Sequence, residues 1–177
     1  MLQIEHFTKE YGNKIAVNDL SLEIRSGEIF GFIGHNGAGK TTTIKAVAGI
    51  LPFQKGEIRV DGISVRENPL ECKKRMAYIP DNPDLYEFLS GIQYLNFIAD
   101  IFQVPKRERE ERIGKYGDLF GLTGDLGSTV STYSHGMKQK LALIGALIHE
   151  PKLLLMDEPF VGLDPKAAHD LKIDRKS

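Results

Sequence analysis

The segment Gly34–Thr42, with the sequence GHNGAGKTT, decides the fold of this 177-residue chain. It fits the pattern G-x-x-x-x-G-K-[ST], in which the backbone N–H groups of a glycine-rich loop surround phosphate oxygens. The apolar run Ile29–Ile33 before the loop predicts a buried strand, and Thr41–Ala48 after it predicts a helix with a partially positive N-terminus. This order of strand, loop and helix favours a phosphate site over a chance glycine turn.

Two side chains of the loop have expected roles in binding a nucleotide. Lys40 should reach the terminal phosphates, and Thr41 should offer its hydroxyl to Mg²⁺. The other residues expected to line the phosphates are Gly34, His35, Asn36, Gly37, Ala38, Gly39 and Thr42.

Two acids follow a second apolar run, in the segment KLLLMDEP (Lys152–Pro159). A buried parallel strand that ends in carboxylates places them at the edge of the sheet where ligands bind. We expect Asp157 to hold Mg²⁺ through water, and Glu158 to orient or deprotonate an attacking water. A strand that ends in a polar turn before Pro159 is the alternative.

Apolar periodicity along the rest of the chain predicts an α/β fold with a mainly parallel sheet. Strands are expected at Leu2–Phe7, Leu20–Ile24, Ile29–Ile33, Glu57–Val60, Met76–Ile79 and Leu153–Met156. Helices are expected at Thr41–Ala48, Ser90–Phe102, Lys106–Tyr116 and Gly136–His149. The consecutive helices indicate an inserted helical lobe, roughly residues 84–145. Its first helix should bury a stripe made of Ile92, Leu95, Ile98, Ile101 and Phe102, and the charged run Lys106–Arg112 should be a solvated helix face.

A third motif is YSHGMKQKLAL, Tyr133–Leu143. Ser134 can cap the helix that begins there, and Gly136 permits a close approach to its backbone. A helix start with positive charge in its first turn suits a phosphate.

In their order and spacing, the three motifs resemble the ATP-binding subunit of ABC transporters, and especially that of bacterial drug or peptide exporters. The resemblance covers nearly all of residues 1–177 and implies a P-loop NTPase fold with an N-terminal antiparallel β part. It also implies an ATPase, with ATP and Mg²⁺, that energises export through a separate membrane permease. The permease would select the exported substrate.

The resemblance assigns further residues. Such domains work as head-to-tail pairs, so Ser134 and Gly136 would cap the ATP held by a second ABC ATPase subunit, with an ordinary helix cap as the alternative. Tyr11 would stack on adenine, or be a plain surface tyrosine. Asp81 lies where the family has a glutamine that contacts Mg²⁺, although a turn residue is as well supported. Asp164, in VGLDP, would couple the two sites.

The chain also departs from the family pattern. Tyr133, His135 and Met137 replace the leucine, first glycine and glutamine of the usual signature. The family continues with further strands, one of which ends in a histidine that contacts the γ-phosphate, and His169 lies too early for that role. We therefore expect a chain that lacks the last strands of the fold. Homodimer and heterodimer stay open, as do a catalytically impaired fragment and a soluble ABC-type regulator.

The composition argues against a nucleic-acid-binding, a disulfide-stabilised or a membrane-spanning protein. The chain is 41% hydrophobic and 27% charged with a formal net charge of -1, which gives no general attraction to nucleic acid. One cysteine, Cys72, excludes an internal disulfide, and no apolar run approaches the roughly 20 residues of a membrane span. We expect a cytoplasmic protein, peripheral on the inner face of the cell membrane, with no nucleic-acid partner.

Overall fold

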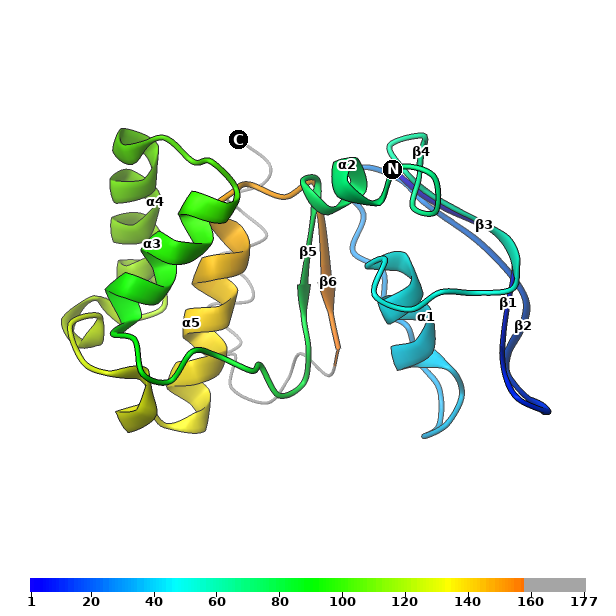
Figure 1. Ribbon diagram of the computed structural model, residues 1–177, viewed down its shortest axis with the longest axis horizontal. Helices are drawn as coiled ribbons and strands as arrows, with labels where there is room; N and C mark the ends of the chain where they lie inside the picture. Colours follow the sequence, from blue (N-terminus) through cyan, green and yellow to red (C-terminus); the bar gives the residue numbers. More distant parts are fainter. Residues whose placement is uncertain (158–177) are drawn as a thin grey trace. The chain divides into compact units, whose positions relative to one another are not determined.

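Figure 1 shows the computed structural model, which describes residues 1–157. This part of the chain divides into two units, the first made of Met1–Tyr78 and Lys152–Asp157 and the second of residues 79–151. The elements of the first unit are β1 (Leu2–Tyr11), β2 (Lys14–Ile24), α1 (Lys40–Val47), β3 (Lys55–Val60), β4 (Ile63–Ser64), α2 (Pro69–Lys73), β5 (Met76–Ile79) and β6 (Leu153–Met156).

The N-terminal strands of the first unit form an antiparallel sheet in the order β2-β1-β3-β4. Leu2, Ile4 and Phe7 of β1 are buried together with Ile58 and Val60 of β3. Leu2 and Ile4 alternate along β1, as Ile58 and Val60 do along β3, and their burial fixes the register because a slip of one residue would turn them to the other face. The predicted N-terminal antiparallel part is confirmed.

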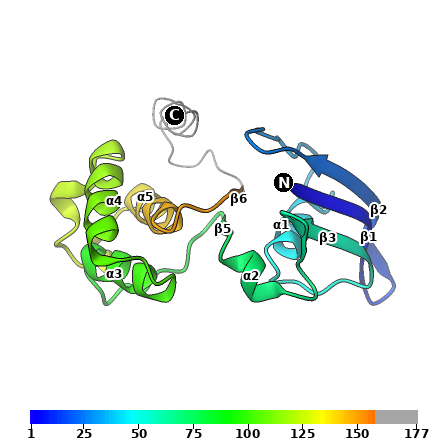
Figure 2. The ribbon, with the colours of Figure 1, turned by 90° about the horizontal axis from the view of Figure 1, so that it is seen from above.

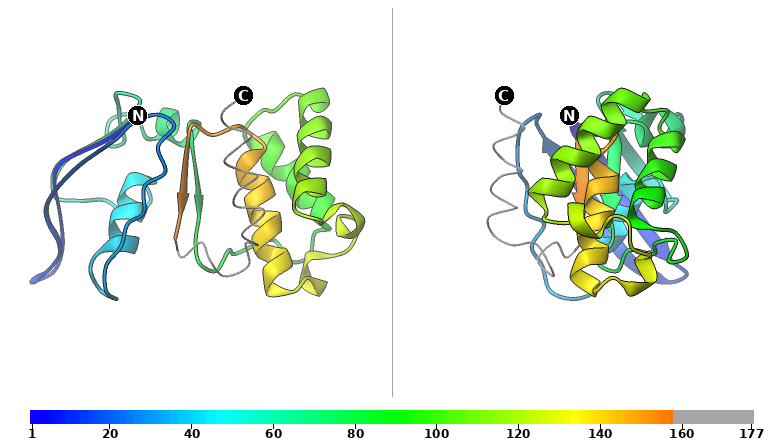
Figure 3. Two further views of the ribbon diagram at one scale, coloured as in Figure 1. Left: turned by 180° about the vertical axis from the view of Figure 1, so that it is seen from behind. Right: turned by 90° about the vertical axis from the view of Figure 1, so that its left-hand side faces the viewer.

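The strands β5 and β6 pair in a second sheet and run in the same direction (Figures 1 and 3). Their bounds are those that the two apolar runs predict. Cys72 is buried in α2, just before β5, and its thiol donates to the carbonyl of Ile63.

The predicted strand at Ile29–Ile33 is wrong. These residues adopt no regular secondary structure, and Ile33 is 98% exposed. A run of apolar residues predicts burial, but a strand also needs a neighbour to satisfy its backbone groups. No strand of residues 1–157 pairs with this segment.

The second unit is helical within the described residues, and Figure 2 shows its three longer helices packed together. Its elements are α3 (Gly91–Ile101), α4 (Lys106–Leu119), the 3₁₀ turns η1 (Thr123–Asp125) and η2 (Val130–Thr132), and α5 (His135–Leu147). Residues 84–145, predicted as an inserted lobe, lie within this unit.

The first helix of the second unit starts at a capping box, in which Ser90 and Gln93 each satisfy the other's backbone N–H. Its buried face consists of Gly91, Tyr94, Leu95 and Ala99. The predicted stripe is therefore partly wrong: Leu95 is buried, but Ile101 is exposed. The apolar spacing predicts the helix, but the buried face is the one that packs against α5, where Tyr94 and Leu95 lie beside Gly145.

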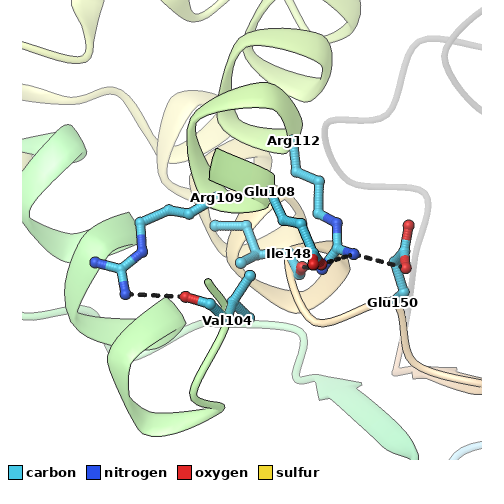
Figure 4. A network of polar contacts seen from close by, with 6 residues as sticks. All are labelled: Val104, Glu108, Arg109, Arg112, Ile148 and Glu150. Atoms are coloured by element: carbon cyan, nitrogen blue, oxygen red, sulfur yellow. Dashed lines mark hydrogen bonds and ion pairs between the residues drawn. The ribbon is translucent and has the colours of Figure 1, made fainter. Parts of the chain in front are cut away.

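The charged helix α4 is only partly a solvated face (Figure 4). Arg109 donates to the carbonyl of Val104, and Arg112 donates to the carbonyl of Ile148 at 2.8 Å. Arg112 also pairs with Glu108 at 2.6 Å and Glu150 at 2.9 Å. These two arginines turn inward and tie α4 to the preceding loop and to the end of α5.

Candidate functional site

The glycine-rich loop lies in the first unit and leads directly into α1. Gly39 is the N-cap of α1, and no side chain caps the helix, in contrast to the serines that cap α3 and α5. The first N–H groups of a helix have no partner within it. Those of α1 are consequently available to an anion, as the sequence pattern predicts.

A β-bulge explains why glycine is required at position 39. Lys9 pairs with Val17 and Glu10 with Ile15, so that Ala16 is an extra residue in β2. A Cβ atom on Gly39 would lie 2.6 Å from the carbonyl oxygen of Ala16, and the backbone φ there is 86°. The hairpin and the loop therefore approach each other through a glycine.

Lys40 lies across the loop that precedes it. Its Nζ donates to the carbonyl oxygens of Gly34 at 2.6 Å and His35 at 2.9 Å. The loop is closed in part by a backbone bond from Ala38 to His35. An ammonium group held at the loop backbone is placed to meet a phosphate bound there.

The acid at the end of β6 meets the residue that follows Lys40. The hydroxyl of Thr41 donates to Oδ1 of Asp157 at 3.1 Å, and Asp157 is only 9% exposed. A hydroxyl and a carboxylate are the oxygen ligands that Mg²⁺ takes in nucleotide sites, together with phosphate oxygens. The residues present therefore fit a magnesium nucleotide.

Tyr78 of β5 is a neighbour of this acid that the sequence did not reveal. Burial raises the pKa of its hydroxyl, and the negative charge of Asp157 raises it further. The hydroxyl is buried without a hydrogen-bond partner in residues 1–157.

Tyr11 ends β1 and pairs with Lys14 across the hairpin. Ala16, which touches Gly39, lies two residues further along β2, about 7 Å at the usual rise of a strand. Tyr11 is 49% exposed, so its ring is open to a ligand. This distance along β2, from the partner of Tyr11 to the residue beside the phosphate loop, is shorter than an extended nucleoside triphosphate.

The signature-like motif lies in the second unit, at the start of α5. Ser134 caps the helix by accepting the N–H of Met137 at 3.3 Å, and a Cβ atom on Gly136 would meet nothing within 4 Å. Tyr133 is buried beside them, and its hydroxyl donates to the carbonyl of Asp125 at 2.6 Å. A Cβ atom on Gly91 would lie 2.3 Å from that hydroxyl.

The other predicted site residues are distributed as follows. His35, Asn36 and Gly37 are exposed in the loop, and Thr42 lies in the first turn of α1. Asp81 is exposed in the second unit, where its carbonyl accepts the side chain of Gln139 at 3.2 Å. Glu158, Asp164 and His169 lie outside the described residues.

Residues 1–157 contain neither a membrane span nor a metal site made by side chains alone. None of the helices in residues 1–157 has the length and apolar content of a membrane span. No group of three or more His, Cys, Asp or Glu side chains is arranged there to hold a metal ion. A magnesium site of the kind described above needs no such group, because phosphate and water supply most of its ligands.

The glycine-rich loop that leads into α1, together with the pair formed by Thr41 and Asp157, is typical of a nucleotide-binding domain of the P-loop class. The family model described as "ABC transporter" matches residues 17–161. The chain belongs to this family, and the predicted α/β, P-loop NTPase class is confirmed.

Relatives and solved structures agree with this assignment. YhcH of Bacillus subtilis (strain 168), an uncharacterized ABC transporter ATP-binding protein, is 40% identical over 97% of this chain and 55% of its own length. LnrL of the same organism, a linearmycin resistance ATP-binding protein, is 35% identical over 97% and 55%. A solved ATP-binding subunit of an ABC transporter has a TM-score of 0.90 at 34% identity, over 99% of this chain and 73% of that one. The chain thus spans about half the length of the curated relatives it matches.

Proposed function

We propose that this chain binds MgATP at Gly34–Thr42 and belongs to a subunit that hydrolyses ATP to energise export through a separate membrane permease. The observation that carries the proposal is the hydrogen bond from Thr41 to Asp157. It joins the glycine-rich loop to the acid at the end of β6, two segments that are 116 residues apart in sequence. The alternative, a strand that ends in an ordinary polar turn, does not predict a hydrogen bond between Asp157 and the hydroxyl of Thr41.

Each residue of the site has a role in this proposal. Lys40 compensates the charge of the terminal phosphates, and Thr41 and Asp157 hold the metal ion. Glu158 orients the water that attacks the γ-phosphate. Mg²⁺, when bound, reduces the charge repulsion between that water and the phosphates. Positioning and charge supply most of the rate enhancement in such a transfer.

The proposal extends to the second unit and to a second subunit. Ser134 and Gly136 contact the nucleotide held by a partner ATPase, and Tyr11 stacks on the adenine of the chain's own nucleotide. Asp81 takes the place of the metal-contacting glutamine of the family. The exposed Ser134 and the open space at Gly136 support this role, because both are accessible to a ligand from outside the chain.

Export is supported by the names of relatives, since LnrL is a resistance protein. A second relative, YbhF of Escherichia coli, is described as a probable multidrug transporter ATP-binding protein. A subunit of this type works at the cytoplasmic face of the membrane, on its permease.

The test is calorimetric binding of ATP to the full chain with and without Mg²⁺. Thr41→Ala and Asp157→Asn should each reduce the magnesium-dependent gain in affinity by about tenfold, about 1.4 kcal/mol. Thr123→Ala is the matched control, because it removes another hydroxyl that donates to an aspartate, Asp118, at 2.6 Å. A parent chain that fails to bind ATP, or Thr41→Ala with unchanged magnesium dependence, contradicts the proposal.

A further inference from the structure

We infer that Lys9 is a positioning residue for recognition of the nucleotide base: its ammonium group lies behind the ring of Tyr11 and strengthens stacking on the opposite face. This inference rests on the proposed function, since it requires that Tyr11 meets the base of a bound nucleotide. It concerns a residue outside the three sequence motifs.

The geometry is that of a cation over an aromatic ring. The Nζ atom of Lys9 lies 4.8 Å from the centroid of the Tyr11 ring. The two residues are separated by one position in β1, and such residues point to the same face of a strand. The lysine therefore occupies one face of the ring, while the 49% exposure of Tyr11 leaves the other face accessible.

The burial of Lys9 is unusual for its residue type. It is only 6% exposed, whereas lysines are almost never fully buried without a partner. Within residues 1–157 its ammonium group makes no ion pair and no hydrogen bond, and the ring of Tyr11 is the one partner of that group. The nearby acid Glu10 pairs instead with Lys55, at 4.0 Å.

The position of Lys9 follows from the same bulge that brings the hairpin to the loop. Lys9 pairs with Val17, directly beside the extra residue Ala16 that contacts Gly39. The cation, the ring and the phosphate loop are thus connected through one short stretch of backbone. A change in the charge on one face of the Tyr11 ring should therefore change the stacking energy of a base on the opposite face.

The physical effect is a polarised ring. A cation on one face draws π-electron density toward itself, which makes the opposite face a better partner for an electron-rich purine. It also restrains the ring in one orientation before a ligand arrives, which lowers the entropy lost on binding. Both effects act on the base and neither acts on the phosphates.

The experiment separates base from phosphate by comparing two ligands, MgATP and magnesium tripolyphosphate, in calorimetric titrations of the full chain. Lys9→Met should weaken ATP binding by about three- to tenfold, the range expected for a partly buried cation–π contact, and leave tripolyphosphate binding within about twofold. Lys9→Arg, which keeps a cation over the ring, should restore ATP affinity. Lys55→Met is the control for the loss of a positive charge on the same sheet.

A double-mutant cycle with Tyr11→Leu gives the second measurement. Without the ring, Lys9→Met should no longer change the ratio of ATP to tripolyphosphate affinity. Equal weakening of both ligands, or a loss that persists without the ring, overturns the inference. If Lys9→Met does not fold, Lys9→Gln replaces it under the same criteria.

Failure of this inference and failure of the proposed function give different results. A parent chain that binds neither ligand contradicts the proposed function. A parent chain that binds both ligands equally keeps its phosphate site but has no base platform, and that outcome overturns the role of Lys9.

Discussion

At the residue scale, Gly39 is the position at which sequence, backbone and site are most tightly connected. Its φ of 86° is strained for any residue with a Cβ atom, and the carbonyl of Ala16 fills the space that such an atom would need. Gly37 has a similar φ of 84°, but a Cβ atom there would meet nothing within 4 Å. Substitution of Gly37 therefore introduces backbone strain alone, whereas substitution of Gly39 introduces both strain and a steric clash.

We predict that Gly39→Ala lowers the free energy of unfolding by about 2–4 kcal/mol, whereas Gly37→Ala lowers it by about 1 kcal/mol. Urea denaturation followed by circular dichroism measures both. The difference between the two variants is the contribution of the contact with the β2 bulge. Equal losses would show that the hairpin yields without cost.

At the element scale, α5 is held at both ends by side chains. Ser134 caps its start, and Arg112 donates to the carbonyl of Ile148 at its C-cap (Figure 4). The side chain of Arg112 is 18% exposed, but its acidic partners are more exposed and their attraction is screened. Its main contribution is therefore the hydrogen bond to the helix end.

Arg112→Met should consequently destabilise the protein by about 1–2 kcal/mol, with faster amide exchange in the last turn of α5. Hydrogen exchange followed by mass spectrometry detects this local change. Arg107→Met, on the exposed face of the same helix, is the control and should leave the exchange of α5 unchanged. Unaltered exchange in the arginine variant would mean that the helix end is held by packing alone.

The same scale shows which parts of the fold could be predicted from sequence. Helices α3 and α5 agree with their predicted bounds within a few residues because an apolar period and a serine cap are local signals. The segment Ile29–Ile33 was wrongly predicted because a strand depends on a partner elsewhere in the chain. The short elements α2 and β4 carry too few residues for a periodic signal.

The site divides in the same way. The loop Gly34–Thr42 could be predicted because its motif is continuous, and its junction with Asp157 followed from the position of that acid at a strand end. The anchoring of Tyr133 could not, since it depends on a carbonyl eight residues earlier and on the missing side chain of Gly91. The position of Lys9, two residues before Tyr11 in a strand, could have indicated that the two side chains share a face. Its burial could not be predicted, because it depends on the bulge in β2.

At the scale of the whole molecule, buried phenol and thiol groups make stability depend on alkaline pH. Burial raises the pKa of Tyr94 to about 12, with a smaller effect from Tyr86. Burial also raises the pKa of Tyr133, as does the charge of Asp125, and burial raises the pKa of the Cys72 thiol. The pKa of each group is higher in the folded state than in the unfolded state. Each group therefore contributes its full stabilisation at pH values below its unfolded pKa.

That contribution should be lost as the pH rises from the unfolded values toward the folded ones. We predict that the urea midpoint falls between about pH 9 and about pH 12, and that tyrosinate absorbance appears together with unfolding. Tyr94→Phe, which cannot ionise, should make the fall less steep. A midpoint that is constant over this range would mean that the buried hydroxyls ionise without opening the fold.

The serine cap of α5 has one more consequence for the molecule as a whole. Ser134 accepts the N–H of Met137 with an oxygen lone pair, and this leaves its own proton free to donate. The cap of the helix and the proposed phosphate contact would thus use different parts of one hydroxyl group. If Ser134 contacts the nucleotide of a second subunit as proposed, that contact would leave the hydrogen bond that caps α5 in place.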